Sequence, residues 1–406
     1  MCARLPLAYR FRATWGLAMS IAVETGLERL LADACRLLRD RRVGLVAGPS
    51  AVTRDLTGAA KALLAAGVHL TALFAAEHGL YGAAAAGVAV GHARDARTGL
   101  PVFSLYGETQ EPTPEMLAGV DLLAFDMQDV GARFYTFFST LFRVLQAGAR
   151  HGRPVVVLDR PNPITGLAVG GPLLDPALQS FVGLLPVPVR HGLTMGELAR
   201  LACATCRIPA ELTVVPMAGW RRELWFDQTG LPWVPPSPAM PHLSTATLYP
   251  GLCLLEGTNL SEGRGTALPF EICGAPWLDG HELAGALNAL GLGGVRFRSI
   301  RFTPTAGKHA GEACGGVQAH VTGRQALRPV EAGLHLIAAA RAQAPERFAF
   351  LAPPGEGQAP YFDLLAGTSG LREGVAAGVP VEELARRWAG DLSDFLQARR
   401  SCLLYD

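Results

Sequence analysis

The chain has 406 residues, half of them hydrophobic, and its 36 basic and 35 acidic side chains leave a net charge of +1. This length predicts two or three domains, and the hydrophobic content excludes an intrinsically disordered protein. The mixed charges form no basic stripe, so nucleic acid is not expected as a partner.

Residues 1–40 are expected to comprise a leader and a first helix, which the apolar spacing of Gly26–Asp40 predicts. The apolar run Trp15–Val23 is shorter than the hydrophobic region of a secretory signal, and Glu24 follows at once. Met19 is an alternative start. The protein is therefore expected in the cytoplasm, with a secreted or periplasmic location as the alternative if the leader acts as a signal. No stretch reaches the length of a membrane span.

Residues 41–245 alternate between continuous apolar runs and segments with helical spacing. Strands that are buried on both faces read as continuous apolar runs, so the pattern indicates a parallel sheet covered by helices on both sides. We therefore predict an α/β fold with a Rossmann-like N-terminal domain. The chain lacks G-x-G-x-x-G and the P-loop signature, so no nucleotide cofactor is expected. The predicted strands are 43–47, 69–79, 120–131 and 153–163, and the predicted helices are 56–67 and 134–151.

Residues 246–406 are expected to form a smaller α+β domain, with a cleft between the two domains. The Pro- and Trp-rich passage Trp225–Gly251 has little periodicity and is interpreted as an ordered loop that closes over this cleft. The remaining pattern predicts strands at 295–303 and 315–322 and helices at 330–343 and 381–398.

Polar residues follow each predicted strand of the first domain. Because the carboxyl ends of parallel strands meet at one edge of the sheet, these residues are expected to converge on one cleft. Two carboxylates suit acid/base work on a glycosidic or other acetal bond, and Arg and Asn suit the binding of a carboxylate or acetamido group. The strand-end candidates are Glu77, His78, Asp126, Asp129, Arg133, Asp159, Arg160 and Asn162.

Several of these residues also have purely structural interpretations. Asp129 could be a helix N-cap that pairs with Arg133, and Asp159 with Arg160 could form a turn with a local salt bridge. His191 precedes a helix and could lie beside its cap. Glu77 has no comparable structural explanation, because it follows an apolar strand directly, and this favours a functional role.

Metal binding is the main rival to acid/base chemistry. The expected ligand spacings His-x-His and His-x-x-x-His are absent, so no metal is expected. The pair Cys203 and Cys206 lies on an apolar helical pattern without a second pair at zinc spacing, and both are expected to be buried reduced thiols. A metal site would have used His78, Asp126, Asp129 and His191.

A family resemblance is carried by the motifs AAEHGLYG, FDMQDVGARFYTF, LDRPNPITG, YPGLCLLEGTNLSEGRGT and KHAGEACGGVQ. They resemble a bacterial family of exo-β-N-acetylmuramidases (NamZ-like), formerly known as a domain of unknown function, from about Val43 to beyond Val330. The resemblance implies a Rossmann-like domain, a smaller C-terminal domain and an active site between them. It also implies release of N-acetylmuramic acid from the non-reducing end of peptidoglycan fragments, without nucleotide or metal. Muropeptides or disaccharides derived from peptidoglycan would be the partners, in cell-wall turnover and recycling.

The resemblance also implies roles for individual residues. Glu77 is expected to be one catalytic carboxylate. Its partner stays open among Asp175, Glu197 and Glu262, and Glu262 is the preferred choice. The expected substrate-binding residues are His78, Asp126, Asp129, Arg133, Tyr135, Asp159, Asn162, His191, Asn259 and Arg264.

Selection of muramic acid would need a group that recognises its lactyl carboxylate. Arginine presents the matching cationic fork, so at least one of Arg133 and Arg264 is expected to provide it, with Arg160 in reserve. The chain departs from the family pattern at Gly48, where relatives commonly carry Asn, and at Gly170, where they often carry an acid. The second departure motivates an alternative, a muropeptide-binding protein that has lost catalysis. A different glycosidase or esterase in the same cleft is a third hypothesis.

Overall fold

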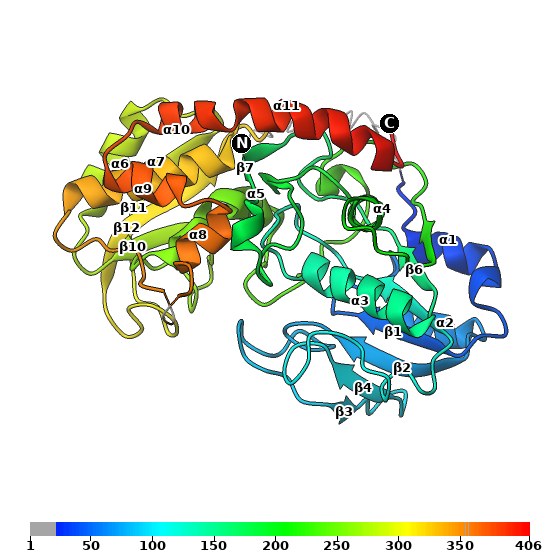
Figure 1. Cartoon of the computed structure of the whole chain (residues 1–406). Coiled ribbons are helices and arrows are strands. Elements are labelled where there is room, and N and C mark those ends of the chain that lie inside the picture. The colour runs from blue at the N-terminus through cyan, green and yellow to red at the C-terminus, as the bar shows by residue number, and fades with distance from the viewer. Residues whose placement is uncertain (1–21, 354, 356) are drawn as a thin grey trace, which may run out of the picture.

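The computed structural model describes residues 22–353, 355 and 357–406, and the leader predicted before residue 22 lies outside the described residues. The first domain is built on a seven-stranded sheet (Figure 1). Its strands are β1 (Val43–Ala47), β2 (Leu70–Ala75), β3 (Ala93–Arg94), β4 (Pro101–Ser104), β5 (Leu122–Asp126), β6 (Val155–Leu158) and β9 (Leu212–Val215).

The sheet has the order β3-β4-β2-β1-β5-β6-β9, and every neighbouring pair is parallel except β3 with β4. Numbered along the chain, its six parallel strands follow the order 3-2-1-4-5-6 of doubly wound folds. Ala47 pairs with Ala75 on one side and with Asp126 on the other, so β2, β1 and β5 end at the same edge. The α/β prediction is confirmed.

Side chains that alternate along each strand enter two separate cores. Leu123 and Phe125 of β5 pack in the cluster that contains α3, whereas Leu122 and Ala124 pack in the cluster that contains α1 and α2. Both faces are thus apolar, which explains the continuous apolar runs in the sequence. The helices of this domain are α1 (Gly26–Ala32), α2 (Ala59–Ala65), α3 (Phe137–His151) and α4 (Met195–Thr205).

One predicted helix of the first domain is too long. Residues 26–40 were expected to be one helix, but α1 ends at Ala32 and a 3-10 turn, Arg36–Leu38, follows. Ala34 and Cys35 both adopt a φ of 50°, a left-handed conformation that ends a right-handed helix. Apolar spacing alone does not reveal this break.

The second domain has a three-stranded antiparallel sheet covered by helices. A helix, α5, occupies part of the passage that was expected to be a loop. The prediction missed it because its sequence LSTATLYPGL is apolar and largely buried, without helical periodicity. The single helix expected at 381–398 is two helices that meet at Trp388. The elements are α5 (Leu243–Leu252), η4 (Cys253–Gly257), β10 (Ile272–Ala275), α6 (Gly280–Ala289), β11 (Val295–Phe302), β12 (Cys314–Val321), α7 (Pro329–Gln343), α8 (Tyr361–Ala366), α9 (Gly370–Ala376), α10 (Val381–Arg387) and α11 (Ala389–Ala398).

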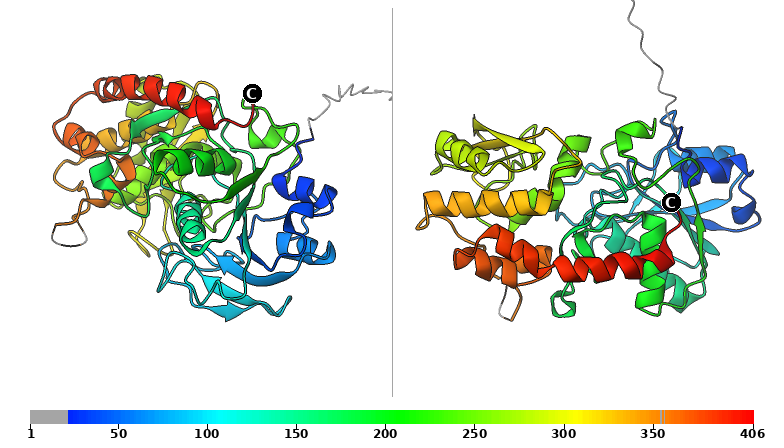
Figure 2. Two further views of the ribbon diagram at one scale, coloured as in Figure 1. Left: turned by 45° about the vertical axis from the view of Figure 1, so that its right-hand side comes forward. Right: turned by 90° about the horizontal axis from the view of Figure 1, so that it is seen from above.

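The C-terminal segment returns to the first domain. Figure 2 shows α11 running from the helices of the second domain toward the C terminus, which lies over the first. The Tyr405 hydroxyl donates to Asp159 at 2.6 Å, and the Leu404 N–H donates to Glu197 at 3.0 Å. A hairpin of β7 (Gly170–Leu173) and β8 (Pro188–Arg190) packs against α7 and α11. Within the described residues, no helix is both long and apolar enough to cross a membrane.

Candidate functional site

A cavity of about 420 Å³ lies where loops at the carboxyl edge of the sheet face α5, η4 and α8 of the second domain. The sheet domain contributes the residue that follows β2 and the loop between β5 and α3. The second domain contributes side chains from the glycine-rich motif of residues 254–277. The lining residues that matter for chemistry are Glu77, His78, Tyr106, Phe134, Tyr135, Thr136, Tyr249, Cys253, Glu256, Arg264, Phe270 and Tyr361.

Glu77 lies two residues beyond the end of β2 and is 8% exposed. One carboxylate oxygen accepts from the N–H of Gly87 at 2.8 Å, and the other accepts from the hydroxyl of Thr136 at 2.7 Å. His78 adopts a φ of 71°, which turns the chain sharply just after Glu77. No cationic side chain in the described part of the chain forms a salt bridge with Glu77. Burial, together with this carboxylate, raises the pKa of Tyr106 to about 12.

Glu256 is the second carboxylate of the cavity, and it is paired with Arg264. The Nε of Arg264 donates to Glu256 at 2.7 Å, and the thiol of Cys253 donates to the other oxygen at 3.3 Å. The guanidinium lies over the ring of Phe270, 4.9 Å from its centroid. Burial opposes the charge of Arg264, but the carboxylate of Glu256 outweighs it, so the pKa of Arg264 is raised. Arg264 is thus a fixed cation in the cavity.

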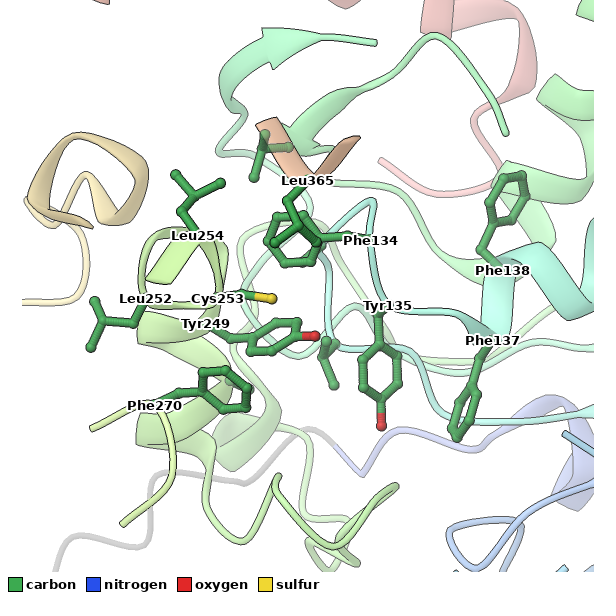
Figure 3. Packing of buried hydrophobic residues seen from close by; sticks show 14 of the residues in the cluster. Phe134, Tyr135, Phe137, Phe138, Tyr249, Leu252, Cys253, Leu254, Phe270 and Leu365 are labelled. Atoms are coloured by element: carbon green, nitrogen blue, oxygen red, sulfur yellow. The ribbon is translucent and has the colours of Figure 1, made fainter. Parts of the chain in front are cut away.

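Aromatic side chains form the wall between these two carboxylates. Figure 3 shows Phe270, Tyr249 and Tyr135 next to one another along the contact between the domains. Tyr249 packs edge-on against Phe270 at 4.7 Å and against Tyr135 at 6.0 Å between ring centroids. The Tyr135 hydroxyl is fully buried and lies close to Ser237. Burial raises the pKa of Tyr135 well above its ordinary value.

The structure therefore brings four of the predicted site residues to the cavity. These are Glu77, His78, Tyr135 and Arg264. Two carboxylates, one cation and several rings are the groups that a sugar with an acidic substituent would need.

The acids at the ends of β5 and β6 do not line this cavity, and their predicted substrate contacts stay a prediction. Asp126 is fully buried and forms an ion pair with Arg160, whose Nη2 lies 2.9 Å from one carboxylate oxygen. Asp159 is also fully buried and accepts from the hydroxyls of Thr194 and Tyr405 at 2.7 and 2.6 Å. Burial raises the pKa of Asp159 to about 6. The local salt bridge expected between Asp159 and Arg160 does not form, because Arg160 pairs with Asp126 instead.

Asp129, Asn162 and His191 are not among the residues that line the cavity. Asp129 accepts from the N–H of Gly131 at 2.6 Å and lies 3.4 Å from the Nε2 of His191. It is not an N-cap, because α3 begins at Phe137. The Asn162 amide donates to the carbonyl of Leu193 at 2.9 Å and accepts from a backbone N–H within its own turn. These contacts fix loops.

Arg133, which was expected to bind the lactyl carboxylate, does not line the cavity. The side chain is 2% exposed and donates to the carbonyls of Pro172, Val187 and Leu365 at 2.8 to 2.9 Å. Burial lowers the pKa of Arg133 to about 9. Because Leu365 belongs to α8, this arginine joins the two domains behind the cavity.

None of the three candidates for the second carboxylate lines the cavity. Glu262 is 3% exposed and pairs with Lys308 at 2.9 Å, with the Nε of Arg264 3.6 Å away. Glu197 caps α4 and pairs with Arg222 at 2.6 Å. Asp175 caps a 3-10 turn.

Two further predicted positions lie outside the cavity lining. The side chain of Asn259 bonds to the backbone of Arg347 and Ala349 at 2.7 and 3.0 Å. Gly170 lies in β7, so the acid that relatives often carry there would not belong to this cavity. The departure at Gly170 therefore gives no reason to expect lost catalysis.

Sequence reasoning missed Glu256 and Thr136 as site residues. Glu256 belongs to the same glycine-rich motif as Arg264, and Thr136 directly follows Tyr135. No local signal distinguishes Glu256 from the other acids of that motif, and its pairing with Arg264, eight residues later, is seen only in the fold.

Among the described residues, no group of three or more His, Cys, Asp or Glu side chains could hold a metal ion. Cys203 and Cys206 are free thiols, as expected, but neither is fully buried. Cys203 is half-buried and Cys206 is exposed, because Cys206 is the C-cap of α4, where the buried face of the helix has ended.

Comparison with known proteins places this architecture in one family. The model of the N-terminal domain of the exo-β-N-acetylmuramidase NamZ matches residues 43–244, and that of its C-terminal domain matches residues 247–405. The chain is 45% identical over 384 residues to the peptidoglycan β-N-acetylmuramidase NamZ of Bacillus subtilis, which covers 94% of this chain and 91% of that protein.

Two solved structures of DUF1343 family proteins from Bacteroides fragilis share the fold. One superposes with a TM-score of 0.87 at 34% identity, covering 95% of this chain and all of that one. The other has a TM-score of 0.75 at 29% identity and covers 95% of this chain and 99% of that one. With both domain models matched in order and a relative at this identity over nearly the whole length, the chain belongs to the exo-β-N-acetylmuramidase NamZ family.

Proposed function

We propose that this protein is an exo-acting glycoside hydrolase that releases N-acetylmuramic acid from the non-reducing end of peptidoglycan fragments. The observation that carries this function is the difference between the two carboxylates of the cavity. Glu77 is held by an N–H and a hydroxyl without a cation, whereas Glu256 is held by Arg264. Such a difference in environment supports a division of roles, with proton transfer by Glu77 and a fixed charge on Glu256.

Glu77 is suited to move the proton. In the hydrolysis of a glycoside, the bond from the anomeric carbon to the leaving oxygen breaks as an acid protonates that oxygen. A water oxygen then bonds to the anomeric carbon and gives a proton to the carboxylate of Glu77, which restores the acid. The N–H of Gly87 and the hydroxyl of Thr136 fix the carboxyl plane of Glu77 without neutralising it.

Glu256 supplies a negative charge close to the same cavity. Positive charge develops on the sugar ring in the oxocarbenium-like transition state, and a fixed carboxylate stabilises it. The ion pair with Arg264 keeps this charge in place, and Cys253 orients its second oxygen. The rings of Tyr135 and Tyr249 offer apolar surface to the sugar.

The size of the cavity supports action at a chain end. A volume of about 420 Å³ is near the lower end of the range for small-ligand sites, which is roughly 300–1,000 Å³. A terminal sugar fits such a cavity, whereas an internal sugar of a long glycan would need an open groove. The substrates that we propose are muropeptides or disaccharides derived from peptidoglycan.

The direct test uses the 4-nitrophenyl β-glycosides of N-acetylmuramic acid and of N-acetylglucosamine. We expect release of 4-nitrophenol from the muramic glycoside and much slower release from the glucosamine glycoside. Tight binding of N-acetylmuramic acid without any release would instead identify a muropeptide-binding protein. Faster release from the glucosamine glycoside would indicate a different glycosidase.

A further inference from the structure

We propose that Arg264 selects the substrate by binding the lactyl carboxylate of muramic acid with its two terminal nitrogens. This inference rests on the proposed function and names the residue that determines specificity at the same site. N-acetylmuramic acid differs from N-acetylglucosamine by a lactyl ether on O3, which carries a carboxylate. An enzyme that discriminates between them needs a group that recognises this carboxylate.

The orientation of Arg264 leaves the useful side of its guanidinium free. Its Nε is bonded to Glu256, and its face rests on Phe270. Neither terminal nitrogen hydrogen-bonds to a residue in the part of the chain that the structure describes. The side chain is 26% exposed and lines the cavity, so a ligand can reach it. A guanidinium fixed in this way presents two parallel N–H donors, which match a carboxylate.

The other cations near the cavity are already engaged. The guanidinium of Arg133 donates to three backbone carbonyls outside the cavity. Lys308 contacts Glu262 at 2.9 Å and also donates to the carbonyls of Leu255 and Thr258. Among the described residues that line the cavity, Arg264 is the only arginine or lysine.

The surrounding charges favour this use of Arg264. Lys308 lies nearer to Glu262 than Arg264 does, at 2.9 against 3.6 Å, so Glu262 is balanced mainly by the lysine. Arg264 therefore has one close acidic partner, Glu256, which contacts the Nε edge. A bound carboxylate would take the opposite edge without displacing Glu256.

The size of the effect follows from the bond that is lost. A hydrogen bond to a charged group contributes enough to change affinity on the order of 10- to 100-fold. N-acetylglucosamine lacks the acceptor, so its binding does not depend on this bond. Loss of the Arg264 fork should therefore reduce the difference between the two sugars rather than weaken both.

The chain offers a matched control in Arg324. Its guanidinium is bonded to Asp227 at 2.7 Å and lies 4.8 Å from the ring centroid of Trp225, which resembles the setting of Arg264. Arg324 does not line the cavity. Arg324→Met thus removes an arginine with an acidic partner and an aromatic contact, but no proposed substrate contact.

The experiment measures binding of free N-acetylmuramic acid and free N-acetylglucosamine by calorimetry, in the whole chain carrying Glu77→Gln. Adding Arg264→Met should weaken N-acetylmuramic acid by about 10- to 100-fold and leave N-acetylglucosamine nearly unchanged. Arg264→Lys, which keeps the charge without the fork, should give an intermediate loss, and Arg324→Met should give none. Melting temperatures identify any variant that fails to fold.

Two outcomes would overturn the proposal. In one, Arg264→Met leaves the ratio of the two affinities unchanged; in the other, it weakens both sugars alike while Arg264→Lys restores neither. Because sugar binding is measured without turnover, a failure of the hydrolase assay would not be confused with a failure of Arg264. Selective binding without turnover would retain the role of Arg264 and refute the proposed reaction.

Discussion

Glu77 and Asp126 are acids at the same edge of one sheet, yet they have opposite environments. Glu77 follows β2 and reaches a cavity, where it meets an N–H and a hydroxyl. Asp126 ends β5, two strands away, and is fully buried against Arg160. The topology places both acids at the same edge of the sheet. The nearest charged partner of each acid decides whether it can act on a ligand or instead stabilises the fold. This comparison predicts a different result for each acid.

The largest effect is expected at the buried pair. Asp126→Ala leaves Arg160 as a buried charge without its partner, which should lower the free energy of unfolding by about 3–5 kcal/mol. Urea denaturation measures this loss. The control is Asp121→Ala, which breaks an exposed pair with Arg42 and should cost little. If both variants are equally stable, Asp126 is not the structural acid described above.

Glu77→Gln should lower turnover of the muramic glycoside by about 100-fold or more, because glutamine keeps the shape but cannot transfer the proton. The melting temperature should barely change, since the Gln carbonyl oxygen can still accept from the N–H of Gly87 and its amide NH2 can donate to the hydroxyl of Thr136. Steady-state kinetics on the purified variant provides the measurement. Turnover close to that of the wild type would remove Glu77 from the mechanism.

Asp159 should give stability a distinct pH dependence. Its folded-state pKa is about 6 because of burial, against roughly 3.9 in an unfolded chain. The folded protein then binds the proton more tightly, so stability is full below about pH 4 and falls as the pH rises to about 6. The difference corresponds to about 2–3 kcal/mol. In Asp159→Asn, this part of the slope of unfolding free energy against pH should vanish; a slope unchanged from wild type would refute it.

Tyr405→Phe tests the smallest contribution, the hydroxyl that joins the C-terminal segment to Asp159. Loss of this bond, and of the one that the same oxygen accepts from the N–H of Met217, should lower the free energy of unfolding by about 1–2 kcal/mol. Thermal denaturation followed by circular dichroism measures the shift. Turnover per folded molecule should be unaffected, and a large loss of turnover at full stability would connect this contact to the site.

The sheet could be predicted because its evidence is local. Each buried strand is a continuous apolar run, and Glu77 follows such a run directly. Helix α5 could not be predicted, because a helix that is buried on all sides has no hydrophobic periodicity to detect. Strands β4 and β9 were not predicted, because their side chains are only partly buried and form no continuous apolar run.

The site was predicted less completely because its partners are distant in sequence. Asp126 pairs with Arg160, which lies 34 residues later in the chain. Asp159 accepts a hydrogen bond from Tyr405, which lies 246 residues later. No local pattern shows that these acids are already paired. Glu256 was overlooked for the opposite reason, because its glycine-rich motif contains several acids and spacing does not rank them.

The central claim is that the cavity between Glu77 and Arg264, rather than the region over the end of β1, is the active site. A crystal structure of the Glu77→Gln variant with a disaccharide that ends in N-acetylmuramic acid tests this most directly. We predict the terminal sugar in this cavity, with the glycosidic oxygen beside the side chain of residue 77 and the lactyl carboxylate against Arg264. A separate cavity of about 650 Å³ lies over the end of β1, lined by Lys61, Tyr81 and Arg97. Density for the sugar in that second cavity, with the first one unoccupied, would contradict the account.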